Sequence, residues 1–396
     1  MRLFLSLFFC LFCCLSAQAQ TDPDEALYLE RYARAEEARK TRNFMSIYDV
    51  LARVEGAKRL RELPAADGQP IAKTTLDDAR AYVAKRNTKA FIIVKDGEVV
   101  LADYFGETDA YTPLVAKSLA KPLAVIAVGR ALEKGFIPSL NEPAATYFEP
   151  WRGTPKEAIT VYHLLSMRSG LKRQSRYTGP EDVMRKAYLH PRHDEIIIAE
   201  YPLTHTPGTR YDYSNANGDL IAPLITRATG GRYYHWISNE ILGPLSAAGG
   251  SIWLNRRGGM AHSGCCILLP AMTWVKLAML VEQEGVWNGK QLLSRSFVEA
   301  MRTPTPENPF VGMAVYNGKN YAKYRGATNP DLGGGTFHSE PYAADDILLF
   351  DGNGNQVIYI IPSQNLIIAR FGDTPAKELG WDNAFLPNLI YAAVAK

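Results

Sequence analysis

Ser118 and Lys121 are the first residues in this chain whose types and spacing could do chemistry. Residues three apart share one face of a helix, so the lysine amine would lie beside the serine hydroxyl. A buried lysine with a lowered pKa can accept the serine proton, and helix N-terminal N–H groups can stabilise an oxyanion. The same spacing recurs at Ser169 and Lys172, and it is also compatible with a helix-capping serine and a solvated lysine.

Two later patterns could complete this chemistry. Tyr213 and Asn215 form the only Tyr-x-Asn pattern in the chain. The tyrosine could move protons between nucleophile, lysine and leaving group, and the asparagine could hold the lysine and a substrate carbonyl. Further on, the glycines of the segment 350–356 could bring backbone close to a ligand. Taken singly, these patterns are equally typical of a buried tyrosine, a helix-capping asparagine and a hairpin turn.

Strands at both ends of the chain must position these groups around a helical middle. Predicted strands cover 90–94, 98–105, 346–350, 357–361 and 366–371, and Asp96-Gly97 predicts a tight hairpin between the first two. Predicted helices cover 77–85, 118–134, 160–166, 218–229, 270–285, 294–302 and 382–395. We therefore predict an α+β fold, with one antiparallel sheet built from both chain ends and flanked by helices, plus a mostly helical lobe. The site should lie in the cleft between the lobes.

The predicted domain organisation follows from this pattern. Residues 1–19 have a positive start, an apolar run and Ala17-Gln18-Ala19, which is typical of a signal peptide, although an uncleaved anchor is an alternative. Residues 20–74 are predicted to form a charged helical extension, and 75–396 the domain that carries the candidate residues. Within it, a sheet lobe would cover about 75–117 and 300–396, and a helical lobe about 118–299.

Composition excludes several classes of protein. Of the 396 residues, 47% are hydrophobic and 21% charged, which is ordinary for a soluble globular protein. The net charge of +3 comes without a basic block, which argues against nucleic-acid binding. We expect a mature chain without stable membrane insertion, secreted to the periplasm. We also expect no cofactor and no metal site: Cys265 and Cys266 are interpreted as small buried residues rather than a disulfide, and 190–195 as a solvated loop.

In chain order, the three patterns resemble the serine β-lactamase / penicillin-binding-protein superfamily. Within it, the chain looks most like the class C-related branch, which includes 6-aminohexanoate-dimer hydrolase and related esterases. The segments 87–97, 159–171 and 207–215 also resemble that branch, and the second of these argues against Ser169 as nucleophile. The resemblance covers roughly 75–390 and implies a β-lactamase/transpeptidase-like fold.

The resemblance also implies a role for each candidate residue. Ser118 would be the acylated nucleophile, and Lys121 its general base or proton relay. Tyr213 would act as general acid and base for the leaving group and for the deacylating water. Asn215 would position Lys121 and the substrate. The oxyanion hole would combine the Ser118 N–H with one from the late strand.

The late strand departs from the family pattern in one respect. Penicillin-recognising members carry Lys-Thr-Gly, or a variant with histidine, where this chain has neither cation. Aligning on the following glutamine places Gly352 at the motif glycine and Asn353 at the oxyanion donor, while aligning on Gly-x-Gly favours Gly354 and Asn355. We favour the first register. The missing cation weakens the case for a β-lactam substrate with its carboxylate, and Tyr177 is expected to contact a substrate amide.

The sequence therefore predicts a secreted serine hydrolase that cleaves an ester or amide of a small molecule through an acyl-serine intermediate. Two alternatives stay open. One is a catalytically idle binding protein of the same fold, and the other is a peptidoglycan D,D-peptidase or β-lactamase.

Overall fold

The computed structural model describes residues 22–41, 44–326 and 335–394. The predicted signal peptide, residues 1–19, lies outside these ranges. None of the described helices is long and apolar enough to cross a membrane.

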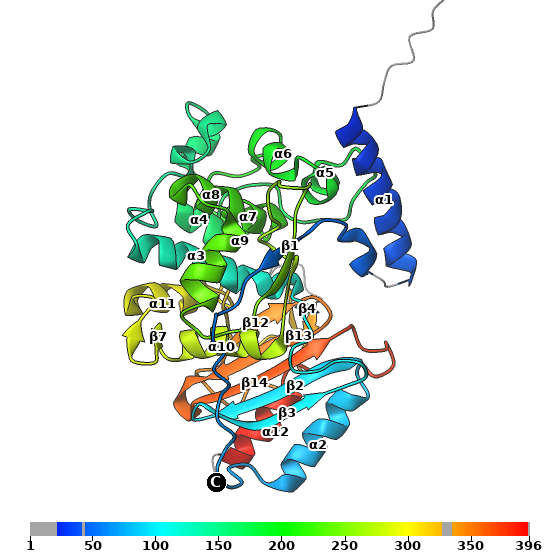
Figure 1. Ribbon diagram of the computed structural model, residues 1–396, viewed down its shortest axis with the longest axis vertical. Coiled ribbons are helices and arrows are strands. Elements are labelled where there is room, and N and C mark those ends of the chain that lie inside the picture. The colour runs from blue at the N-terminus through cyan, green and yellow to red at the C-terminus, as the bar shows by residue number, and fades with distance from the viewer. Residues whose placement is uncertain (1–21, 42–43, 327–334, 395–396) are drawn as a thin grey trace, which may run out of the picture.

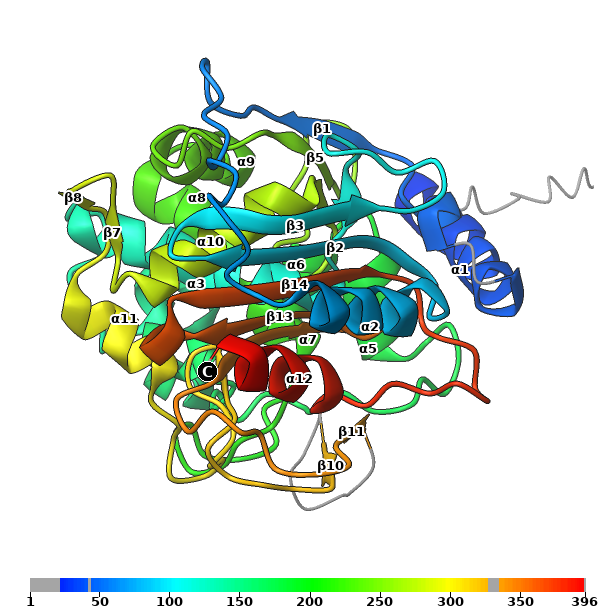
Figure 2. The same cartoon turned by 90° about the horizontal axis from the view of Figure 1, so that it is seen from below.

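A six-stranded antiparallel sheet forms one half of the molecule and joins the two ends of the chain (Figure 2). Its order is β3-β2-β14-β13-β12-β9, and every neighbouring pair is antiparallel. The strands are β2 (Thr88–Lys95), β3 (Glu98–Tyr104), β9 (Tyr316–Asn317), β12 (Leu348–Gly352), β13 (Gln356–Ile361) and β14 (Leu366–Gly372). The predicted antiparallel sheet from both chain ends is confirmed.

Both faces of this sheet are buried, which explains why its central strands are continuous apolar runs. Successive side chains alternate between two cores: Ile92 joins the core shared with the helical lobe, and Ile93 joins the outer core. Helices α2 (Lys73–Ala84) and α12 (Phe385–Val394) cover the outer face, and α10 (Ala271–Glu282) packs on the inner face.

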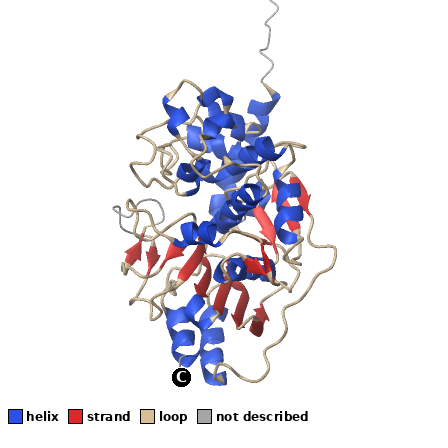
Figure 3. Ribbon diagram, turned by 90° about the vertical axis from the view of Figure 1, so that its left-hand side faces the viewer, coloured by secondary structure: helices blue, strands red, loops and turns tan. Residues whose placement is uncertain are grey.

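The helical lobe lies above the inner face of the sheet (Figures 1 and 3). At its centre is α3 (Ala120–Glu133), which is buried over most of its length and follows the short turn η2 (Lys117–Leu119). Around it are α4 (Val161–Leu165), α5 (Val183–Leu189), α6 (His193–Ala199), α7 (Asn215–Asp219), α8 (Ile221–Thr229), α9 (Tyr233–Ile237), the π-helical turn η6 (Ser238–Leu242) and α11 (Arg295–Arg302). Three 3₁₀ turns, Ala144–Thr146, Glu149–Trp151 and Pro155–Ala158, connect α3 to α4.

Smaller sheets complete the fold. A four-stranded sheet of order β1-β5-β6-β4 contains β1 (Leu51–Val54), β5 (Gly250–Trp253), β6 (Ile267–Leu269) and β4 (Leu114–Val115). Two short hairpins are β7 (Val286–Trp287) with β8 (Lys290–Gln291), and β10 (Tyr324–Arg325) with β11 (Thr336–Phe337). Because β4 runs directly into η2, the small sheet positions the start of α3.

The segment that precedes α2 packs against the helical lobe. Helix α1 (Pro23–Thr41) is followed by the 3₁₀ turn Phe44–Ile47 and by β1. Arg31 of α1 is fully buried, forms two hydrogen bonds of 2.8 Å with Asp49, and donates to the carbonyls of Leu189 and Asn255. The buried charge of Arg31 is therefore stabilised by hydrogen-bond partners from distant parts of the chain.

Two local predictions are wrong for the same physical reason. Cys265 and Cys266 form a disulfide, although they were expected to be unbonded. The backbone on both sides of the pair is held by tertiary contacts, because β6 follows it and the Gly264 N–H donates to a carboxylate before it. Likewise 190–195 is not a solvated loop: His193 is fully buried and Asp194 accepts a 2.9 Å hydrogen bond from Asn255. Partners distant in sequence stabilise both segments.

Candidate active site

Ser118 lies at a sharp turn between β4 and α3. The residue before it, Lys117, has φ of 54°, in the left-handed region that non-glycine residues seldom adopt. Such strain persists where the surrounding structure holds it, and it is common at functional sites. Here the turn presents the Ser118 hydroxyl at the start of the helix, beside Lys121 one turn later.

Lys121 is held by three acceptors, and this decides what its amine can do. Its Nζ lies 3.2 Å from Ser118 Oγ, 3.0 Å from Asn215 Oδ1 and 2.8 Å from the carbonyl oxygen of Gly264. The side chain is 4% exposed. A neutral amine has two N–H donors and one lone pair, and the last two contacts are with oxygens that only accept. A neutral amine that used both donors on these two oxygens would direct its lone pair at the Ser118 hydroxyl, as a general base requires.

Tyr213 completes the group. Its hydroxyl is 2.7 Å from Ser118 Oγ, and Lys121 Nζ is 5.0 Å from the centre of its ring. Its backbone carbonyl accepts a 2.7 Å hydrogen bond from the N–H of Gln174, which fixes the loop before α7. The structure thus brings together Ser118, Lys121, Tyr213 and Asn215 from two separate segments.

Gly264 also contributes to the site, although nothing in the sequence indicated a functional role for it. Its carbonyl accepts from Lys121, and its N–H donates to Asp219 Oδ1 at 2.9 Å. Ser263 ties the same turn to α7 through a 2.7 Å hydrogen bond to the Gly218 carbonyl. A Cβ on Gly218 would lie 2.9 Å from the Gly264 Cα and 3.3 Å from Lys121 Cε, so this close approach requires glycine. A backbone carbonyl leaves no sequence signal, which is why it was missed.

The late strand approaches the nucleophile at Gly352. A Cβ there would lie 3.0 Å from the Ala116 carbonyl oxygen and 3.2 Å from the Leu119 nitrogen, on either side of Ser118. Gln356, its partner on β13, donates 2.9 Å to the Val115 carbonyl. These contacts favour the predicted register with Gly352 at the motif glycine. The side chain of Asn353 is exposed and caps the turn, and the role of its N–H as oxyanion donor stays a prediction.

A small cavity beside the nucleophile has mostly apolar and aromatic walls. Burial raises the pKa of Tyr211 and of Tyr316, so both hydroxyls stay neutral at ordinary pH. One acidic group also lines it, Asp351, which sequence reasoning did not single out although it directly precedes Gly352. The lining residues are Ser118, Lys121, Met167, Tyr211, Tyr213, Val311, Ala314, Tyr316 and Asp351.

Tyr177 is not among the residues that line this cavity. The guanidinium carbons of Arg185 and Arg39 lie 4.7 Å and 5.6 Å from its ring centre, and Gln174 donates to its hydroxyl at 3.1 Å. Its predicted contact with a substrate amide stays a prediction.

One group of side chains has the composition of a metal site. Atoms of His193, Asp219 and His262 lie within 4.8 Å of one another, and all three side chains are buried. However, the two imidazole rings stack 3.9 Å apart at an interplanar angle of 18°. Nearly parallel rings do not direct their lone pairs at one point. Asp219 accepts from Gly264, so this member of the group supports the Lys121 site, whereas the described residues give neither imidazole a hydrogen-bond partner.

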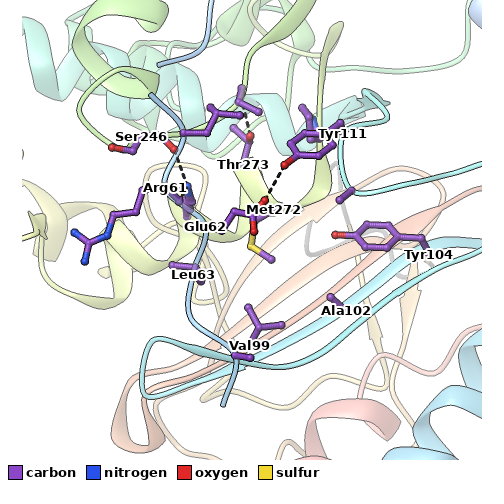
Figure 4. Close-up of a pocket in the computed structure, with 16 residues that line it drawn as sticks. Arg61, Glu62, Leu63, Val99, Ala102, Tyr104, Tyr111, Ser246, Met272 and Thr273 are labelled. Carbon is purple, nitrogen blue, oxygen red and sulfur yellow. Dashed lines mark hydrogen bonds between the residues drawn. The ribbon is translucent and has the colours of Figure 1, made fainter. Parts of the chain in front are cut away.

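A second cavity, of about 330 Å³, lies between the segment 60–65, β3 and the start of α10 (Figure 4). Its polar groups have partners: the Tyr111 hydroxyl donates 2.7 Å to Glu62, and Lys276 donates to the carbonyls of Arg61 and Ser246. Burial lowers the pKa of Lys276 to about 8. These contacts fasten the segment 60–65 to α10 and to Tyr111, and we assign this cavity no chemistry.

Comparison with known proteins agrees with this geometry. The chain is 25% identical over 261 residues to 6-aminohexanoate-dimer hydrolase from Paenarthrobacter ureafaciens, covering 61% of this chain and 65% of that protein. The alignment thus spans slightly less than two thirds of the relative. The putative 6-aminohexanoate-dimer hydrolase from Bacillus anthracis superposes with a TM-score of 0.67 at 18% identity, covering 89% of this chain and 91% of that one. A family VIII carboxylesterase superposes with a TM-score of 0.58 at 16% identity, covering 85% and 100%.

A family model decides the assignment. The model described as Beta-lactamase matches residues 77–376, about three quarters of the chain, and this range includes every member of the Ser118 site. The sheet built from both chain ends and the helical lobe are the β-lactamase/transpeptidase-like fold. Because the family match, the fold and the serine–lysine–tyrosine geometry coincide on the same residues, this chain belongs to the Beta-lactamase family.

Proposed function

We propose that this protein is a secreted serine hydrolase that cleaves an ester or amide of a small molecule through an acyl-serine intermediate. The observation that carries the proposal is the Lys121 amine, which has two acceptor-only partners and faces the Ser118 hydroxyl at 3.2 Å. An idle binding protein would have no need to hold a buried lysine in this arrangement.

Acylation follows from the contacts. As Ser118 Oγ bonds to the substrate carbonyl carbon, its proton passes to Lys121 Nζ. The carbonyl oxygen becomes an oxyanion and accepts hydrogen bonds from the N–H groups of Ser118 and Asn353. The bond to the leaving atom then breaks, and that atom takes a proton from the Tyr213 hydroxyl. Lys121 returns its proton to Tyr213, so the acyl-enzyme forms with both groups in their starting state.

In deacylation, Tyr213 and Lys121 activate a water molecule that attacks the acyl-enzyme. As the water oxygen bonds to the acyl carbon, the Tyr213 hydroxyl takes a proton from the water and passes its own proton to the neutral Lys121 amine. The bond from that carbon to Ser118 Oγ breaks, and the serine oxygen recovers the proton. The 2.7 Å contact between Tyr213 and Ser118 supports this route.

The substrate class follows from the β12 strand and from the relatives. The strand carries Phe350, Asp351 and Gly352 where penicillin-recognising proteins carry lysine or histidine, threonine and glycine. Without that cation, a substrate carboxylate has no partner on the strand. The names of the similar proteins, an aminohexanoate-dimer hydrolase and a carboxylesterase, refer to amide and ester cleavage. We therefore place esters and amides ahead of β-lactams and of peptidoglycan peptides.

Mass spectrometry of intact protein after incubation with a fluorophosphonate tests the proposal. We expect one adduct on the mature protein and none on Ser118→Ala. Lys121→Ala should keep its fold by circular dichroism and lose labelling. A panel of p-nitrophenyl esters, short amides and a penicillin then separates an esterase or amidase from a penicillin-recognising enzyme. No adduct on folded wild-type protein would favour the idle binding protein instead.

A further inference from the structure

The active-site cavity contains a negative charge that the proposed mechanism does not use. Asp351 lines the cavity together with Ser118, Lys121 and Tyr213, and its side chain is 17% exposed. In the described part of the chain, its carboxylate accepts one hydrogen bond, at Oδ2, from the guanidinium of Arg325. The described residues provide no hydrogen-bond donor to the other carboxylate oxygen, Oδ1.

Arg325 neutralises the Asp351 charge from outside the cavity lining. Its side chain is 6% exposed, and its guanidinium carbon lies 4.1 Å from the centre of the Tyr316 ring. Burial acts to lower the pKa of Arg325, but Asp351 and Tyr316 outweigh burial and raise it, so the guanidinium stays charged. Asp351 and Tyr316 line the cavity and Arg325 does not. The ion pair therefore presents its negative end to the substrate.

One member of the pair, Asp351, shares its cavity with the group that is proposed to protonate the leaving atom. Tyr213, which protonates the leaving atom in the proposed mechanism, lines the same small cavity as Asp351 and Tyr316. Lys121 lines the cavity as well, but its amine is engaged with Asn215, Gly264 and Ser118. Asp351 is therefore the charged side chain of the cavity lining that remains to interact with a group attached to the leaving atom.

We propose that Asp351 determines substrate specificity by selecting esters and amides whose leaving group carries a positive charge, and by disfavouring those whose leaving group carries a carboxylate. This inference rests on the proposed hydrolase function and adds a substrate class to it. The physical basis is electrostatic: a charge in a partly desolvated site attracts an opposite charge and repels a like one more strongly than in water.

Three acetyl thioesters with leaving groups of matched size test the inference. Acetylthiocholine carries a trimethylammonium group, 3,3-dimethylbutyl thioacetate is its neutral isostere, and S-acetyl-3-mercaptopropanoate carries a carboxylate. Thiol release gives kcat/KM for each. For wild type at low salt we expect the order cationic, neutral, anionic, with roughly tenfold or more between first and last. The ratio should shrink in high salt because ions screen the exposed carboxylate oxygen.

Two variants distinguish an electrostatic role from a merely structural one. Asp351→Asn leaves the Arg325 charge uncompensated, so the preference should reverse toward the anionic thioester. The double variant Asp351→Asn/Arg325→Gln removes both charges, and its three kcat/KM values should converge. The double variant also avoids a buried unpaired charge, which keeps the test valid if the single variant does not fold. The matched control is Asp103→Asn, because Asp103 on β3 also forms an ion pair, with Arg80 at 2.7 Å. The ratio of kcat/KM for the cationic and anionic thioesters should be the same in this variant as in wild type.

Failure of the inference and failure of the proposed function look different. If wild type hydrolyses the neutral thioester but shows a flat ratio, or prefers the anion, the role of Asp351 is wrong and the hydrolase stands. If the thioesters turn over too slowly, the same leaving groups on a methylphosphonothioate give the ratio from labelling rates at Ser118. Absence of any labelling at Ser118 overturns the proposed function itself, and this inference with it.

Discussion

Replacing Gly218 by alanine should disable the catalytic lysine without touching any group that reacts. A Cβ at this position would lie 2.9 Å from the Gly264 Cα and 3.3 Å from Lys121 Cε. Ordinary carbon–carbon contact needs roughly 3.5–4.0 Å, so the Gly264 backbone must retreat by about 1 Å. That backbone carries the carbonyl that holds Lys121 Nζ at 2.8 Å. The substitution thus moves one of the two acceptors that direct the lysine lone pair.

The size of the effect follows from the displacement. Misplacing a catalytic group by about 1 Å can cost about 10²-fold in rate, or about 2.7 kcal/mol of transition-state stabilisation. Stability should change less. Alanine in place of glycine favours helix by about 1 kcal/mol, which partly offsets the roughly 1–3 kcal/mol cost of overpacking. We therefore expect folded Gly218→Ala protein with kcat/KM reduced about 100-fold.

The assay compares kcat/KM for a p-nitrophenyl ester and the rate of fluorophosphonate labelling, together with urea denaturation. The matched control is Gly231→Ala, where an added Cβ has one neighbouring atom within 4 Å, at 3.6 Å, and no contact with the site. Unchanged activity and stability in Gly218→Ala would refute the reasoning, since it would mean that Lys121 and Gly264 adjust freely.

Three further predictions concern proton transfer, pH and the disulfide. Tyr213→Phe should reduce kcat by about 10²–10⁴-fold while leaving the fold intact, measured with the same ester, because it removes the general acid and base. Hydrogen bonds from Arg31 outweigh burial and lower the pKa of Asp49 to about 2, so its contribution to stability is complete above pH of about 4 and is lost as pH falls toward 2. The free energy of unfolding of wild type should accordingly approach that of Asp49→Asn across that range. Treatment with dithiothreitol should raise the intact mass by two hydrogens, and a Cys265→Ser/Cys266→Ser variant should show no such change.

The local order of elements was predictable from the sequence because it depends on short-range patterns. Asp96-Gly97 adopts positive φ at both residues, as a tight hairpin turn needs, and the strands on either side form β2 and β3. The three late apolar runs form β12, β13 and β14 in a single sheet with them. The motif residues Ser118, Lys121, Tyr213 and Asn215 could be selected in advance because their chemistry belongs to the side chains.

Tertiary structure decided what depends on partners distant in sequence. The Gly264 carbonyl, the Asp351–Arg325 pair and the buried Arg31 are contacts between segments up to 224 residues apart, and no local pattern encodes them. The disulfide between Cys265 and Cys266 was wrongly dismissed because strain was judged for the dipeptide alone. By itself the sequence determined which groups could react. Only the packed chain decided which carbonyl, carboxylate or guanidinium stands beside each of them, because burial and long-range contacts set those neighbours.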